Sequence, residues 1–148
     1  MTQSRAIVSL VRDAADPVAS QGPVLWAMAQ LRDTLAAKGI AVQEQDAGEP
    51  GAGGVTILVA GPTSRQAQDI LAAAGASLPE DPEALALAER YAGGAGRRPA
   101  VLAAGSDVRG LVYAVLELAD RVMYADGDAL DVLRIKEPIV EASPNAIR

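Results

Sequence analysis

Short apolar runs alternate along the chain with longer stretches whose apolar residues recur at helical spacing. Three runs, each bounded by polar residues, glycine or proline, have the length of buried strands: residues 6–11, 55–60 and 100–104. Less apolar runs at 40–45 and 130–135 fit further extended segments. The helical spacing predicts helices over 23–38, 66–74 and 108–124. The pattern therefore predicts a domain in which strands and helices alternate.

The helix predicted over 108–124 carries the clearest apolar face, with apolar residues at 108, 111, 112, 115, 116, 119 and 122. Glu117 and Asp120 fall on the opposite face, and Glu117 precedes Arg121 by four residues, a spacing that suits an exposed ion pair. In the helix over 23–38, positions 24, 25, 28, 31 and 35 form the apolar face and Trp26 lies off it. An exposed Trp26 would suit contact with a sugar or a partner, although tryptophan also commonly covers the edge of a core.

Residues 83–91 fit two kinds of secondary structure. Their Ala, Leu and Glu content favours a helix. However, alanine at 84, 86 and 88 alternates with larger side chains at 85, 87 and 89, as in a strand that turns through the glycines of 93–96 into the run at 100–104. The residue pattern alone leaves both open.

Gly105, Ser106 and Asp107 connect the run at 100–104 to the helix that follows. A helix N-terminus in this position can bind phosphate. Here Asp107 stands where a dinucleotide-binding G-x-G-x-x-G motif has its second glycine, and its carboxylate would repel a pyrophosphate. The chain also lacks the Gly-Lys-Ser/Thr ending of a P-loop. The favoured interpretation is structural: Gly105 makes the turn, Ser106 or Asp107 caps the helix, and Gly110 allows close packing.

A similar turn follows the run at 55–60. Gly61 and Pro62 precede Thr63 and Ser64, either of which suits the N-cap of the next helix. Pro62 has no N–H to offer an anion, so a capped turn is again the favoured interpretation.

The composition limits the available chemistry. The 148 residues include no His and no Cys, which excludes the commonest general base, thiolate catalysis and cysteine-bound zinc. The net charge of −6 argues against nucleic acid or an anionic membrane as a partner. No apolar stretch approaches the roughly 18–20 residues of a membrane helix, and no signal-peptide pattern is present. No metal or other cofactor is indicated, and the compartment, cytoplasmic or exported, stays open.

Residues 101–120 resemble part of the small α/β domain that precedes the catalytic barrel in family 20 hexosaminidases, α-glucuronidases and related bacterial glycoside hydrolases. The shared pattern is a strand, a Gly-Ser/Thr-Asp-x-Arg-Gly turn and a helix that contains Tyr and Glu-Leu. The matching residues of this chain are Gly105, Ser106, Asp107, Arg109, Gly110 and Tyr113. Ala114 departs from the pattern, because the family often has glycine there.

The resemblance implies an α/β fold (an α+β sandwich) with a mixed β-sheet of about four to five strands and two to three helices packed mainly on one face. It also implies that 83–91 is a strand paired with 100–104. Residues 1–137 would form a single accessory domain, and 138–148 a linker toward a catalytic barrel outside this chain. The family's catalytic Asp-Glu motif has no match here, so no catalytic residue is carried over, and the six motif residues transfer as structural positions. Arg109 and Trp26 are the candidates for ligand or interdomain contact.

The favoured expectation is a non-catalytic accessory domain whose partner is its own catalytic barrel, with carbohydrate as a further possible partner. An alternative is an independent module that binds a small sugar or anion at the turns that begin with Gly61 and Gly105. A doubly wound nucleotide enzyme is a third hypothesis, and the missing phosphate motifs weigh against it.

Overall fold

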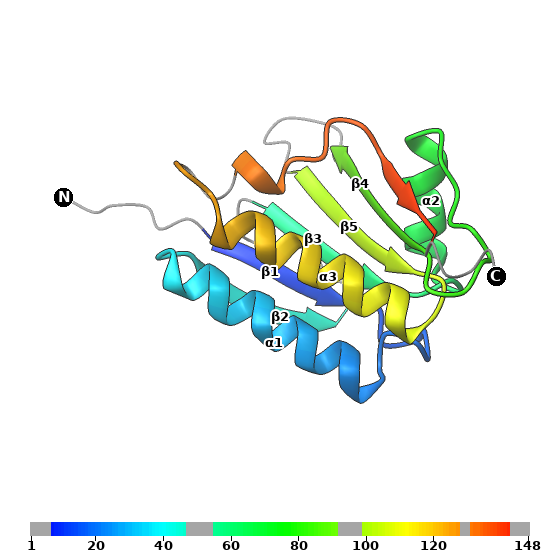
Figure 1. Ribbon diagram of the computed structural model, residues 1–148, viewed down its shortest axis with the longest axis horizontal. Helices are drawn as coiled ribbons and strands as arrows, with labels where there is room; N and C mark the ends of the chain where they lie inside the picture. The colour runs from blue at the N-terminus through cyan, green and yellow to red at the C-terminus, as the bar shows by residue number, and fades with distance from the viewer. Residues whose placement is uncertain (1–6, 47–54, 92–98, 128–130, 143–148) are drawn as a thin grey trace.

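Six strands form one mixed sheet in the order β2-β1-β3-β5-β4-β6 in the computed structural model, which describes residues 7–46, 55–91, 99–127 and 131–142 (Figure 1). The strands are β1 (Ile7–Arg12), β2 (Ala41–Asp46), β3 (Val55–Ala60), β4 (Leu85–Tyr91), β5 (Pro99–Gly105) and β6 (Ile139–Glu141). Strands β2, β1, β3 and β5 pair in parallel, whereas β4 is antiparallel to β5 and β6. The α/β class with a mixed sheet is confirmed, with slightly more strands than expected.

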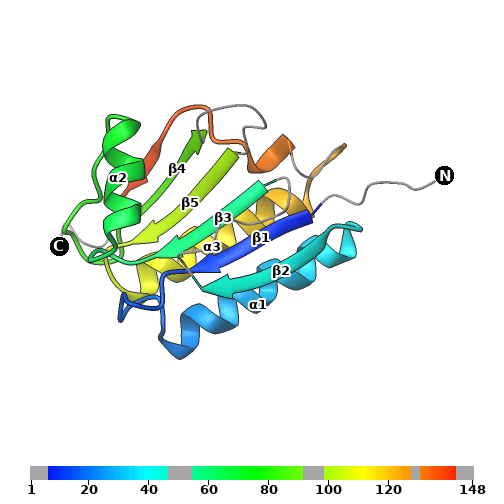
Figure 2. The same ribbon diagram turned by 180° about the vertical axis from the view of Figure 1, so that it is seen from behind.

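The helices lie mainly on one face of this sheet, as predicted. Helices α1 (Gly22–Ala37) and α3 (Val108–Met123) pack side by side on that face, and α2 (Arg65–Ala73) covers the other (Figures 1 and 2). The buried residues of α1 are Val24, Ala27, Met28, Leu31 and Leu35. Leu25 was expected on the buried face, but it is 44% exposed, because it lies a further 100° around the helix from Val24.

Two hydrophobic cores lie on opposite faces of the sheet, and β5 contributes to both. Val101 and Ala103 pack into the core under α1 and α3, whereas Leu102 and Ala104 pack into the smaller core under α2. This alternation is expected for a strand covered on both faces.

Most of the segment 83–91, which fitted either a helix or a strand, forms strand β4. Strand β4 pairs with β5 from Leu85 opposite Gly105 to Tyr91 opposite Pro99. Leu87 enters the core under α3, and Ala86 and Ala88 enter the core under α2. The alternation with period two therefore decides the structure, because as a helix the segment could not fill both cores.

The segment after α3 differs from the expected extended run. In the described part of 130–135, Asp131–Leu133 form a short 3₁₀ helix, η1. Leu133 is fully buried there. The carboxylate of Glu89 on β4 holds the segment in place: it accepts hydrogen bonds from Arg134 Nε and Nη2 at 2.8 and 2.9 Å and from the Ile135 N–H at 2.9 Å. The burial of Leu133 and these hydrogen bonds to Glu89 favour a compact turn over an extended strand.

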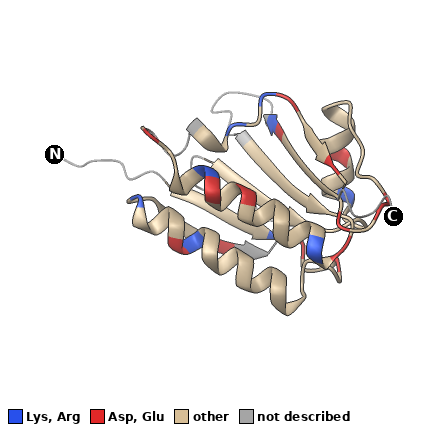
Figure 3. Cartoon of the chain, in the orientation of Figure 1, with Lys and Arg blue, Asp and Glu red and all other residues tan. Residues whose placement is uncertain are grey.

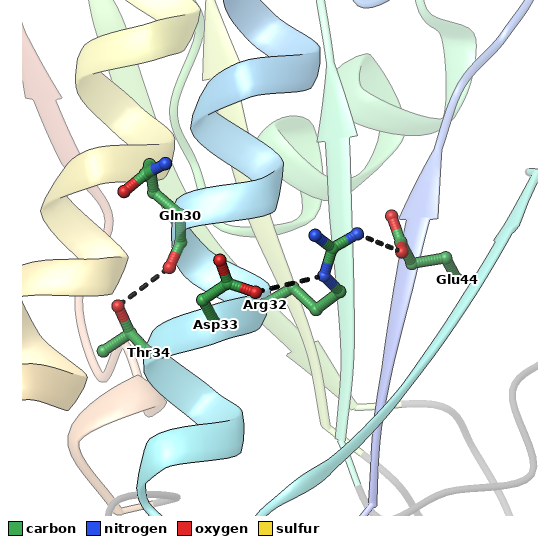
Figure 4. A network of polar contacts seen from close by, with 5 residues as sticks. All are labelled: Gln30, Arg32, Asp33, Thr34 and Glu44. Atoms are coloured by element: carbon green, nitrogen blue, oxygen red, sulfur yellow. Dashed lines mark hydrogen bonds and ion pairs between the residues drawn. The ribbon is translucent and has the colours of Figure 1, made fainter.

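A polar contact joins α1 to the edge strand β2. Arg32 Nη1 donates to Glu44 Oε2 at 2.9 Å, and Arg32 Nε lies 3.5 Å from Asp33 Oδ1 (Figure 4). The hydrogen bond to Glu44, with the attraction of that carboxylate, raises the pKa of the Arg32 guanidinium above its ordinary value. Nearby, the Thr34 hydroxyl donates to the Gln30 carbonyl at 2.8 Å, a local bond within α1.

Charged residues of both signs are spread over the outer surfaces of the helices and strands (Figure 3). Among the residues that the structure describes, no helix combines the length and the apolar character needed to span a bilayer.

Candidate functional site

The turn between β5 and α3 is fixed by side chains that bond to the start of β4. Asp107 caps α3, because its Oδ1 accepts from the Gly110 N–H at 2.8 Å. Its Oδ2 accepts from the Glu83 N–H at 3.0 Å. Ser106 Oγ donates to the Asp81 carbonyl at 2.6 Å and accepts from the Ala84 N–H at 3.1 Å. The motif thus joins the helix N-terminus to the segment that leads into β4.

Two glycines of the motif are required by close backbone packing. A Cβ at Gly105 would collide with the backbone of Gly110 and Leu111 in α3. A Cβ at Gly110 would collide with the carbonyl oxygen of Ala84. The first turn of α3 therefore lies against both β5 and the start of β4, which only residues without a side chain allow.

Glu83 adopts a backbone conformation that is unusual for its residue type, with a φ of 59°. The bond from its N–H to Asp107 stabilises this conformation. Its side chain lies 3.4 Å from Arg109 Nη1. Arg109, which is 72% exposed, therefore lies over the turn at the surface.

A second polar cluster ties the loops after β1 and β3 together. Asp16 is 1% exposed, and its Oδ2 accepts from both the N–H and the hydroxyl of Thr63 at 2.9 and 2.7 Å. Its Oδ1 accepts from the Val18 N–H at 2.8 Å. A Cβ at Gly61 would collide with this carboxylate. Ser64 caps α2 and donates to Asp13 Oδ2 at 2.6 Å.

These two clusters occupy the carboxyl ends of the parallel strands, where α/β proteins commonly bind phosphorylated ligands. The N–H groups of Thr63, Ala67 and Gly110 at these turns are already donated, to Asp16, Ser64 and Asp107 respectively. Carboxylates at both turns would also repel an anion. The geometry therefore favours structural corners over phosphate sites, as the sequence indicated.

A groove of about 510 Å³ runs between α3 and strands β4 and β6. Its apolar lining consists of Leu85, Leu87, Leu116, Ile139 and Ala142. Its polar lining consists of Glu83, Tyr113, Glu117, Asp120, Arg121 and Glu141. Glu117 and Arg121 form the expected ion pair at 3.0 Å, but both also line this groove. Tyr113 is 45% exposed there.

A second cavity of about 590 Å³ lies beside α2 and brings the two turns together. Gly61 and Pro62 line it from one turn and Ser106 from the other. Most of the remaining lining is apolar or uncharged, and Glu80 is its charged member: Ala67, Gln68, Leu71, Ala72, Ala76, Ser77, Leu78, Pro79 and Glu80.

The two residues proposed for ligand or interdomain contact are not lining residues of these cavities, although Arg109 pairs with Glu83, which lines the groove. Arg109 and Trp26 line neither of them. Trp26 is 56% exposed on α1, next to the half-exposed Leu25. Within the described ranges, no group of three or more His, Cys, Asp or Glu residues is arranged to hold a metal ion.

Sequence reasoning missed three features of this region: the role of Asp16, the conformation of Glu83 and the groove. Asp16 and Pro17 give a recognisable turn signal, but the partner, Thr63, is 47 residues away. The groove depends on β6 pairing with β4, which local pattern does not encode.

No protein-family model matches the sequence, and no curated protein matches it. Among solved structures, the fold is similar to part of a GH138 enzyme that targets pectin rhamnogalacturonan II. The match has a TM-score of 0.50 and 16% sequence identity, and it covers 92% of this chain and 12% of that chain. This chain thus has the fold of a small part of a much larger glycoside hydrolase.

Proposed function

We propose that this chain is a non-catalytic α/β domain of a glycoside hydrolase, which supports an adjacent catalytic barrel. The observation that carries the proposal is the agreement between two independent likenesses. The turn-and-helix motif at 105–113 resembles the domain before the barrel in hexosaminidases and α-glucuronidases, and the whole fold is similar to 12% of a GH138 enzyme.

The use of the motif residues supports a structural role. Ser106, Asp107 and Gly110 fix the start of α3 to the start of β4 through hydrogen bonds and close packing. Two carboxylates at glycosidase spacing need a sugar-sized site between them. The acidic groups of the turns are instead saturated by backbone N–H groups and hydroxyls. The activity of the whole protein would then come from the barrel.

The purified chain, assayed with a panel of aryl glycosides, should release no aglycone above the buffer rate. The same chain, produced with the polypeptide that its reading frame encodes after Arg148, should be active, and the added segment should contain a barrel with paired carboxylates. Hydrolysis by the 148-residue chain alone would overturn the non-catalytic role. A downstream segment of another kind would overturn the assignment to a glycoside hydrolase.

A second candidate function is supported by the cavity beside α2. Because it joins both strand-to-helix turns and has a largely uncharged lining, it suits a small neutral sugar better than an anion. Calorimetry with neutral monosaccharides and with uronates tests this function. We expect heat with a neutral sugar only, and its loss in Ala72→Trp, since Ala72 is exposed and lines the cavity. No heat with any sugar would remove this candidate.

A further inference from the structure

The face of the sheet that carries α1 and α3 has an uncovered strip. A helix is about 10 Å wide and neighbouring strands lie about 4.8 Å apart, so one helix covers about two strands. Helix α1 packs beside β2, and α3 packs on β5, β3 and part of β4. On this face α3 therefore covers β4 only in part, and no helix of the described part of the chain packs on the edge strand β6 (Figure 1).

The groove between α3 and these two strands lies over that strip. Its apolar lining is incompletely buried: Leu85, Leu116 and Ile139 all keep partial exposure, although each packs against the main core. Apolar side chains in this position would gain from a further layer of structure, at roughly 25 cal/mol for each Å² removed from water.

The charged residues that line the groove are mainly acidic. Glu83, Glu117, Asp120 and Glu141 line it, against the single guanidinium of Arg121. Arg121 is engaged by Glu117, and Glu83 lies near Arg109. Asp120 and Glu141 are exposed, and their side-chain carboxylates have no hydrogen-bond or ion-pair partner among the residues that the structure describes. Two carboxylates on opposite sides of an apolar groove, one on α3 and one on β6, are thus available to a cationic partner.

We propose that this groove binds an amphipathic helix whose apolar side carries Leu-like residues and whose flanks carry Lys or Arg. Such a helix would complete the layer beside α3, and Asp120 and Glu141 would pair with its basic flanks. The natural source of this helix would be the adjacent domain of the same polypeptide, and in this the proposal rests on the proposed function.

The test uses the full 148-residue chain, labelled with ¹⁵N, and a synthetic peptide of about 18 Leu and Lys residues with Leu at i, i+3, i+4 and i+7. A counterpart peptide carries Glu in place of Lys. We expect the Leu/Lys peptide to shift the amide resonances of β6, β4 and the α3 residues near Tyr113 and Asp120, and the Leu/Glu peptide to bind at least 10-fold more weakly.

The double variant Asp120→Lys/Glu141→Lys should weaken binding of the Leu/Lys peptide by roughly 10-fold, because two favourable charge pairs become repulsive. The control is Asp69→Lys, a single change of the same kind at an exposed site on α2 on the far face; it should alter affinity less than twofold. Far-UV circular dichroism checks that each variant is folded.

Three outcomes would overturn the proposal: no binding of the Leu/Lys peptide, shifts located away from the groove, or equal losses in the control and the double variant. Shifts of the same resonances by oligosaccharides, without any by the peptide, would assign the groove to sugar instead. Each of these results concerns only the docking surface, because the accessory role is decided separately by the glycoside assays and the downstream reading frame.

Discussion

Replacement of Asp107 should destabilise the domain strongly for a residue that is only half-buried. Asp107→Ala removes the α3 cap to the Gly110 N–H at 2.8 Å, which contributes about 1 kcal/mol. It also removes the carboxylate that accepts from the Glu83 N–H at 3.0 Å, a charge-assisted bond worth about 1.5 kcal/mol at the lower end of its range. The free energy of unfolding should fall by about 2–3 kcal/mol.

Asp107→Asn separates the two contributions. The side-chain amide offers one oxygen where the carboxylate offers two, so the variant can keep the helix cap but not the bond from Glu83. Its stability should lie between those of the wild type and Asp107→Ala, with a loss of about 1.5 kcal/mol.

Urea unfolding, followed by circular dichroism at 222 nm, measures these differences through the midpoint at constant m-value. Asp126→Ala is the matched control, since Asp126 is exposed beyond the end of α3, and it should change stability by less than about 0.5 kcal/mol. If Asp107→Ala changed the stability as little as this control, Asp107 would not be joining the start of α3 to the start of β4 as inferred.

Three other substitutions test other parts of the fold by the same unfolding assay. Gly110→Ala should destabilise by about 1–3 kcal/mol although alanine favours helices, because its Cβ would meet the Ala84 carbonyl; a gain in stability would contradict the close packing. Glu89→Gln should cost about 2–3 kcal/mol, since it removes the negative charge and one of the two oxygens that accept from the Arg134 guanidinium at 2.8 and 2.9 Å; an unchanged midpoint would show that these bonds contribute nothing to stability. Asp16→Ala should cost about 3 kcal/mol, because it removes a buried acceptor that the β1–α1 and β3–α2 loops share; a loss below about 1 kcal/mol would contradict this role.

The strands and helices could be predicted wherever one local pattern dominated. Apolar spacing located α3, and the sequence offered Ser106 or Asp107 as its cap, of which Asp107 is the cap in the structure. Residues 83–91 needed the family resemblance, because a helix-favouring composition conflicted with an alternation of period two. The segment at 130–135 was wrongly expected to be extended, since the Glu89 carboxylate that holds Arg134 and Ile135 lies 45 and 46 residues earlier.

The candidate site could be predicted less completely. The turn at Gly105 was interpreted as structural from its own residues, which bond locally and to the segment that leads into β4. The groove could not be predicted, because Asp120 and Glu141 share it only through the pairing of β6 with β4. The contacts proposed for Arg109 and Trp26 stay predictions.

The pairing of β6 has a consequence for motion. Strand β6 is held by three register pairs to β4, from Ile139 opposite Leu87 to Glu141 opposite Leu85, whereas β1 lies between two strands with Val8 and Leu10 fully buried. Opening β6 exposes little core, so its amide hydrogens should exchange with solvent through a local opening, long before those of β1. Strand β6 can therefore open and re-form while the rest of the sheet stays folded. A partner bound in the groove would slow the hydrogen exchange of its amides.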